Sequence, residues 1–167
     1  MAARKTSSTL AAKIRRILRD GGSTEHAEGV QWFFKEKIKS HGWYTGKLRS
    51  EAKRVRREIQ KEYGPSVLLQ VADELFAGRN LEEKVFAIFL LENLTSEFGD
   101  LEFRLFESWL RRISSWADHD GLVHYLIAPM VAAKPGRSKT VFRWAKSPNR
   151  WHRRGWRRQA GPGGARA

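Results

Sequence analysis

Two carboxylates, two histidines and a tryptophan stand close together in the stretch SSWADHDGLVHYLI, residues 114–127. Trp116 and Asp120 are four residues apart, so on a helix they lie on one face, whereas Asp118 points away from both. An aromatic ring beside a carboxylate can bind a cation by cation–π and Coulomb attraction. A core tryptophan and a solvated carboxylate near a helix N-terminus would give the same pattern. The capping-box spacing of Ser115 and Asp118 favours a structural role for Asp118.

Metal and cofactor chemistry receives little support from the residues. His119, Asp120 and His124 offer metal-binding atoms, but their spacing matches no metalloprotease pattern and no third cluster accompanies them. The chain has no cysteine, which excludes a disulfide framework, a thiolate metal site and a cysteine nucleophile. It also lacks a glycine-rich phosphate loop, a GxSxG elbow and an HExxH motif. We therefore expect no metal and no cofactor.

The net charge of +14 is concentrated toward the C-terminus. No acidic residue follows Asp120, whereas residues 121–167 hold eleven Lys and Arg. The first 120 positions hold the other 21 basic residues and all 18 acidic ones, a net charge of +3. A one-signed region of this kind, interleaved with tryptophans, suits a polyanion such as nucleic acid, although basic surfaces also serve solubility.

The stretch VFRWAKSPNRWHRRGW, residues 141–156, places aromatic and basic residues at one helix start. Asn149 is the expected N-cap, and Trp151 and Arg154 share a face of the helix that follows. Free amides and the helix dipole favour an anion there, which predicts a phosphate clamp; a buried tryptophan among solvated arginines is the alternative. The candidate contacts to a nucleic-acid backbone are Lys146, Arg150, Arg153 and Arg154.

Hydrophobic residues recur at helical spacing along nearly the whole chain, and no run of strict alternation indicates a strand. We expect about eight or nine helices with short connections, packed as antiparallel pairs in a solenoid or a bundle. Glycine and proline are expected to end these helices, at Gly21–Gly22 and Gly64–Pro65 among other places. The expected helical segments are residues 10–18, 30–38, 48–63, 65–76, 81–91, 101–113, 116–130 and 141–144, with one more after Asn149.

Length and composition indicate one folded domain over residues 1–158, followed by a small, glycine-rich tail over 159–167 that we expect to be disordered. No window approaches the eighteen or so apolar residues that a membrane span needs, and the N-terminus lacks a signal-peptide core. We therefore expect a soluble, cytoplasmic monomer that does not enter the membrane.

Two of these motifs together resemble the DNA alkylation repair family of HEAT-like repeat glycosylases. They are FxxWxxxISSWAxxD, residues 106–120, and FRWAKSPNRWHRR, residues 142–154. The segment HGWYTGKLRSEAKRV, residues 41–55, resembles the loop and helix before the family's first DNA-facing repeats. The resemblance implies an all-α, curved solenoid of HEAT-like repeats that holds duplex DNA.

The same resemblance implies a reaction: hydrolysis of the N-glycosidic bond of purines made cationic by N3- or N7-alkylation. By position, Trp116 matches an aromatic residue that packs on the sugar of the lesion, and Asp120 matches the catalytic carboxylate. Arg154, with Arg153 beside it, matches an arginine that grips the DNA backbone next to the lesion. The implied partner is double-stranded DNA containing alkylated bases.

Members of the family continue for several helices beyond the NxWxRR element, so the resemblance implies that this chain lacks the family's last helices. A tryptophan from that region completes the family's aromatic cleft, and Trp151 is the candidate for such a role here. Three functions are therefore weighed. They are an alkylpurine DNA glycosylase, a non-catalytic DNA-binding relative, and a helical scaffold for protein partners.

Overall fold

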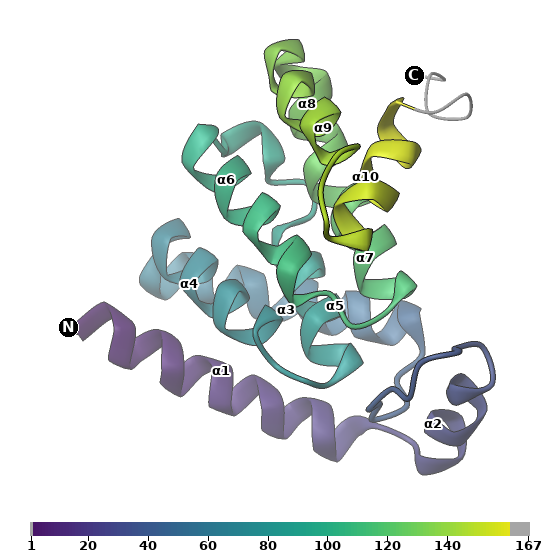
Figure 1. Ribbon diagram of the computed structural model, residues 1–167. Helices are drawn as coiled ribbons and strands as arrows, with labels where there is room; N and C mark the ends of the chain where they lie inside the picture. The colour runs from purple at the N-terminus through teal and green to yellow at the C-terminus, as the bar shows by residue number, and fades with distance from the viewer. Residues whose placement is uncertain (1, 161–167) are drawn as a thin grey trace. The chain divides into compact units, whose positions relative to one another are not determined.

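The structure, a computed structural model, describes residues 2–160 (Figure 1). Within this range the regular elements are helices, and β pairing is limited to an isolated bridge between Lys39 and Asn80. The predicted all-α helical-repeat fold is confirmed. The helices are α1 (Ala2–Gly21), α2 (Thr24–Gln31), α3 (Thr45–Tyr63), α4 (Pro65–Phe76), α5 (Leu81–Leu91), α6 (Asp100–Trp109), α7 (Trp116–Leu122), α8 (Ala128–Ala133), α9 (Ser138–Trp144) and α10 (Arg150–Ala160).

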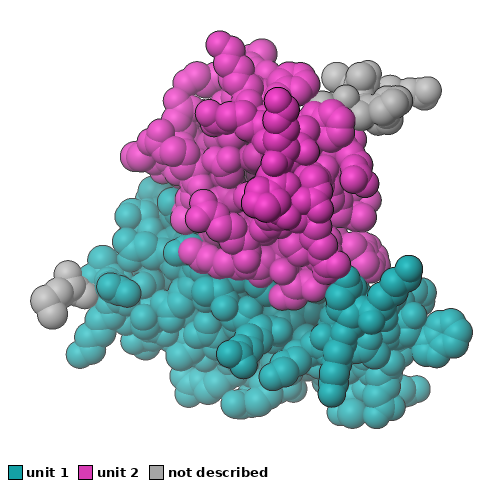
Figure 2. Space-filling view, in the orientation of Figure 1, with its two compact units in different colours: residues 1–91 teal, residues 92–167 magenta. Residues whose placement is uncertain are grey.

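The chain forms two compact units, Met1–Leu91 and Glu92–Ala167 (Figure 2). A single domain over 1–158 stays a prediction. Of the expected tail, Gln159 and Ala160 belong to α10, and residues 161–167 lie outside the described residues. None of the helices in 2–160 combines the length and the apolar character that a crossing of the lipid bilayer requires.

In the first unit, α5 is the central helix. Six consecutive residues, from Phe86 to Leu91, are buried, so this helix is surrounded on all sides. It contacts α1, α3 and α4, as its apolar sequence predicts. The α3 helix is amphipathic: it buries Leu48, Ala52, Val55 and Ile59 and exposes basic side chains on its other face.

The predicted helix over residues 30–38 is wrong. The second helix, α2, lies earlier in the chain, where the Ser23 hydroxyl caps its start by accepting from the amide of His26 at 3.3 Å. After Gln31 the chain leaves the helix and runs as a loop to Tyr44. No residue of α2 and none of residues 30–38 is buried, so the helical apolar spacing of this segment does not correspond to a core face.

A glutamine explains why the helix ends there. The Gln31 side chain donates to the carbonyl oxygen of Glu36 at 2.9 Å and accepts from the amide of Ile38 at 3.0 Å, which satisfies the loop backbone without helical bonds. Phe33, whose position in the apolar spacing predicted a core residue, is 76% exposed, and the adjacent Trp32 is 90% exposed. Side-chain hydrogen bonds to the backbone five and seven residues later therefore override the apolar spacing.

The loop before α3 is built around one buried carboxylate. Glu82, at the start of α5, accepts from the Ser40 hydroxyl at 2.6 Å and from the amides of His41, Gly42 and Trp43 at 2.9–3.3 Å. Gly42 has a positive φ of 76°, and a Cβ there would lie 1.9 Å from a backbone oxygen. The loop conformation thus depends on Glu82 and on the absence of a side chain at Gly42.

The second unit contains a nearly continuous helix from α7 through α8. Its middle, Val123–Ile127, is a π-helical segment in which the amide of Ala128 donates to the carbonyl of Val123. Pro129 follows at once; it has no amide hydrogen and its ring crowds the carbonyl four residues earlier. The wider π turn accommodates the proline without ending the helix, so the helix predicted over 116–130 is confirmed with an irregularity that the sequence pattern did not predict.

We expect Glu82→Ala to destabilise the protein by about 3 kcal/mol or more, because each buried donor left unsatisfied costs about 1–3 kcal/mol. Urea unfolding measures the change. The matched control is Glu58→Ala, which removes an exposed carboxylate paired with Arg54 and should change the free energy of unfolding by less than about 0.5 kcal/mol. Equal effects of the two substitutions would contradict the role of Glu82.

Candidate functional site

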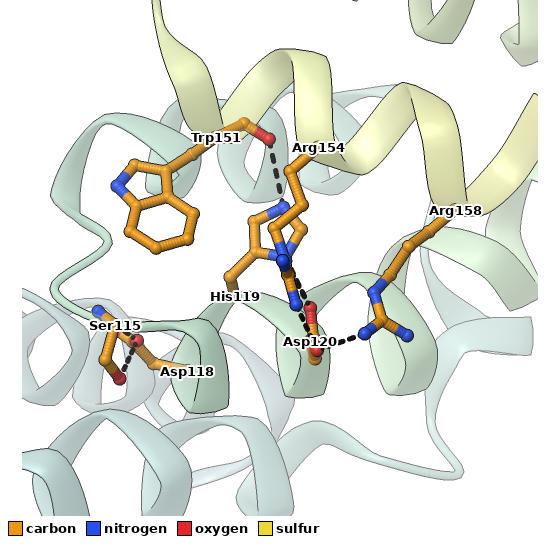
Figure 3. Close-up of polar contacts among 7 residues, drawn as sticks. All are labelled: Ser115, Asp118, His119, Asp120, Trp151, Arg154 and Arg158. Carbon is orange, nitrogen blue, oxygen red and sulfur yellow. Dashed lines mark hydrogen bonds and ion pairs between the residues drawn. The ribbon is translucent and has the colours of Figure 1, made fainter. Parts of the chain in front are cut away.

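The helix that carries the candidate carboxylate starts with a buried capping box (Figure 3). The side chain of Asp118 is completely buried. One of its oxygens accepts from the amide and the hydroxyl of Ser115 at 2.8 and 2.9 Å, and the other accepts from the amide of Ser114 at 2.8 Å. The structural role predicted for Asp118 is confirmed, and this cap fixes where α7 begins.

The cap presents Trp116 and Asp120 on one face of α7, one turn apart. Trp116 is 42% exposed, which disagrees with a purely core tryptophan. The Asp120 side chain is 20% exposed, so it is partly shielded but open to solvent on one side. An accessible aromatic surface and a carboxylate therefore share this face.

Asp120 is the centre of a network that joins α7 to α10 (Figure 3). Arg154 binds it in a bidentate manner, Nε donating to Oδ1 at 3.0 Å and Nη2 donating to Oδ2 at 2.9 Å. Arg158 donates to Oδ2 at 2.5 Å, and the Nδ1 atom of His119 lies 2.8 Å from Oδ1. Both oxygens of the carboxylate thus have two polar partners.

This network keeps Asp120 ionised. Burial alone would raise the pKa of the carboxyl, but the hydrogen bonds from Arg154 and His119 and the positive charges of Arg154 and Arg158 outweigh burial. The pKa of Asp120 is therefore lowered below its ordinary value of 3.8. At neutral pH Asp120 therefore carries a negative charge, which its two arginine partners balance.

His119 connects the carboxylate to the backbone of α10. Its side chain is fully buried, its Nε2 atom lies 2.9 Å from the carbonyl oxygen of Trp151, and its ring stacks on the Trp151 ring with centroids 5.4 Å apart. Burial lowers the pKa of His119 below 6.5, against the opposing effect of the hydrogen bonds to Asp120 and to Trp151. The ring is therefore neutral at pH 7.

The predicted cap of α10 is confirmed. The Asn149 side chain accepts from the amide of Trp151 at 2.8 Å. Arg153 turns back toward the preceding loop, and its Nη1 atom donates to the carbonyl oxygens of Ser147 and Pro148 at 2.7 and 2.8 Å. In this structure Arg153 thus braces the loop that leads into α10, and its predicted contact to DNA stays a prediction.

Two further candidates for backbone binding are on the surface. Lys146 and Arg150 are exposed, and the guanidinium of Arg150 lies 4.4 Å from the centre of the Trp151 ring. Among the predicted site residues, the structure brings Asp120 and Arg154 into direct contact and links Trp151 to them through His119. Lys146, Arg150 and Arg153 are not members of this network.

Two members of the network were missed as functional residues. Arg158 has a detectable signal, because it lies four residues after Arg154 and so shares its helix face. His119 was weighed only as a metal ligand, although it adjoins Asp120 in the chain. Within the described residues 2–160, no three or more His, Asp or Glu side chains are grouped so as to hold a metal ion.

The model of one family, described as DNA alkylation repair enzyme, matches residues 14–156. The chain belongs to the DNA alkylation repair enzyme family. The match includes the whole of α7 and the start of α10, with Trp116, Asp120 and Arg154. No curated protein and no solved structure matches the chain. Membership of this family confirms the predicted resemblance and associates the protein with repair of alkylated DNA.

In this alkylation-repair family member, Asp118→Ala should destabilise the second unit by about 2 kcal/mol or more, because three donors at the start of α7 lose their acceptor. Asp118→Asn keeps one acceptor oxygen and should destabilise it less. Urea unfolding followed by tryptophan fluorescence measures both. If the alanine variant were as stable as the wild type, the cap would not determine the position of α7.

Acid should destabilise the protein through two histidines. Burial lowers the pKa of His119 and of His152 below 6.5. As pH falls through about 6.5, these histidines become protonated in the unfolded chain while they are still neutral in the folded chain. The free energy of unfolding therefore decreases. Urea titrations at pH 7.5 and pH 5.5 test this. The double variant H119N/H152N should show a weaker decrease, and a wild type that is more stable at pH 5.5 would contradict the argument.

Proposed function

We propose that this protein is a DNA glycosylase that hydrolyses the N-glycosidic bond of N3- or N7-alkylated purines in duplex DNA. One observation carries the proposal: Asp120, an ionised carboxylate on the same face as the accessible Trp116, is paired with arginines that can also bind phosphate. Alkylation at N3 or N7 makes the purine a cation, and a fixed anion beside an aromatic surface suits a cation.

The reaction requires little beyond this charge. As the C1′–N9 bond breaks, its electron pair neutralises the cationic purine, and the sugar acquires oxocarbenium character. Asp120 stabilises the positive charge that develops on the sugar and orients a water molecule toward C1′. The water oxygen forms the new bond to C1′, and its proton passes to Asp120 or to solvent. The products are the free base and an abasic site.

Binding of DNA frees the Asp120 carboxylate from its arginine partners. A guanidinium binds phosphate with the same two-pronged geometry that it uses for a carboxylate. When a phosphate of the DNA backbone accepts hydrogen bonds from Arg154 and Arg158, these groups leave Asp120, and oxygen lone pairs become available for water and for the substrate cation. Lys146, Arg150 and Arg153 contribute further positive charge along the backbone, which makes binding dependent on salt.

We expect Asp120→Asn to reduce excision by about 100-fold or more, because it removes the negative charge and keeps the shape. Its affinity for DNA should stay close to that of the wild type, since Arg154 and Arg158 remain. The measurement is single-turnover release of base from a duplex that contains N7-methylguanine or N3-methyladenine. A filter-binding or anisotropy assay measures affinity in parallel.

The matched control is Asp100→Asn. Asp100 is also a carboxylate of the second unit paired with two basic side chains, Lys134 and Arg137, but it is not on α7. This control should excise at the wild-type rate. Salt-dependent binding without release from the wild type would identify a non-catalytic DNA-binding relative. If DNA were not bound at all, a scaffold for protein partners would be favoured.

A further inference from the structure

The hydrogen-bonding capacity of Asp120 is fully used in the structure. A carboxylate accepts about four hydrogen bonds through its two oxygens. Oδ1 is contacted by Arg154 and His119, and Oδ2 is contacted by Arg154 and Arg158. A water molecule or a substrate cation therefore competes with these partners for a hydrogen-bonding position on the carboxylate.

The partners differ in how easily they can move. The side chains of Arg154 and Arg158 are 40% and 51% exposed, and both end in groups that bind phosphate well. The side chain of His119 is 0% exposed and adjoins Asp120 in the chain, so it stays in place when the arginines turn to DNA. Once the arginines leave, His119 is the neighbour that still restrains the carboxylate.

His119 is itself held firmly. Its Nε2 atom contacts the Trp151 carbonyl oxygen, and its ring lies against the Trp151 ring. The backbone of α10 approaches the ring at Gly155: a Cβ there would lie 3.7 Å from Nε2 of His119, an ordinary contact, and 3.3 Å from the ring of Trp144, a tight one. The imidazole is thus fixed by α10 on one side and by Asp120 on the other.

We propose that His119 is a positioning residue, whose Nδ1–H donates to Oδ1 of Asp120 and keeps the carboxylate oriented while Arg154 and Arg158 bind the DNA backbone. The proposal rests on the glycosylase function for its kinetic consequence. It does not rest on that function for its structural content, which is the direction of one hydrogen bond. A neutral ring donates from one nitrogen only, and the Nδ1–H tautomer is favoured because an unprotonated Nδ1 would face a full negative charge at 2.8 Å, whereas an unprotonated Nε2 faces only the neutral carbonyl of Trp151 at 2.9 Å.

Two substitutions of His119 test its contact with Asp120 separately from its contact with Trp151. The amide nitrogen of an asparagine occupies nearly the position of Nδ1, so His119→Asn keeps a donor for Asp120 and loses the contact to Trp151. The longer His119→Gln places its amide near the position of Nε2, so it keeps the contact to Trp151 and loses the donor for Asp120. Both remove the buried ring, and therefore both should lose similar stability in urea unfolding.

Positioning predicts different kinetics for this pair. His119→Gln should lower the single-turnover excision rate roughly tenfold or more, the scale of a misplaced catalytic group, with unchanged affinity for DNA. His119→Asn should stay within about threefold of the wild type. Equal loss of rate in both variants, in proportion to equal loss of stability, would show that the ring only fills space and would overturn the proposal.

Nuclear magnetic resonance gives a test that does not need activity. In the wild type, long-range ¹⁵N–¹H correlations should show His119 protonated at Nδ1, and a ring protonated at Nε2 alone would overturn the proposal. A ¹³C titration of the carboxyl should show a raised pKa of Asp120 in His119→Gln and little change in His119→Asn. If both results hold while the wild type releases no base, the glycosylase function fails and the positioning role stands.

Discussion

The ion pairs between Asp120 and two arginines of α10 are the interaction on which the second unit's site depends. A partly buried carboxylate is unfavourable unless donors compensate for the water that it loses, and Arg154 and Arg158 provide these donors. The same bonds hold α10 against α7, and the stacking of the His119 ring on the Trp151 ring reinforces them. The carboxylate proposed for catalysis and the guanidinium groups proposed for binding phosphate therefore belong to one hydrogen-bonded network.

The solvent exposure of each partner of Asp120 determines whether DNA can draw it away from the carboxylate. Exposed ion pairs contribute little to stability, so exchanging a carboxylate for a phosphate at Arg158 involves only a small loss. The fully buried His119 is in the opposite situation, because moving it would leave a cavity. DNA, with its dense negative charge, thus competes for the arginines and leaves the histidine where it is.

Features set by neighbouring residues could be predicted from the sequence. The cap formed by Ser115 and Asp118, the cap at Asn149 and the shared face of Trp116 and Asp120 all depend on separations of two to four residues, and the structure has them. Contacts between distant segments were missed. The loop bound by Glu82 joins positions about forty residues apart, and the contact of His119 with Trp151 joins positions 32 apart. No local pattern encodes such pairings.

The helix that carries Asp120 is anchored on both sides of the site, which explains how it can present a charged group without shifting. Its start is fixed by the buried Asp118, and its continuation through the π segment buries Leu122, Leu126 and Met130 in the core of the second unit. Had Pro129 ended the helix, Met130 and the rest of α8 would no longer continue it. The π turn thus preserves the rigid element on which the position of the carboxylate depends.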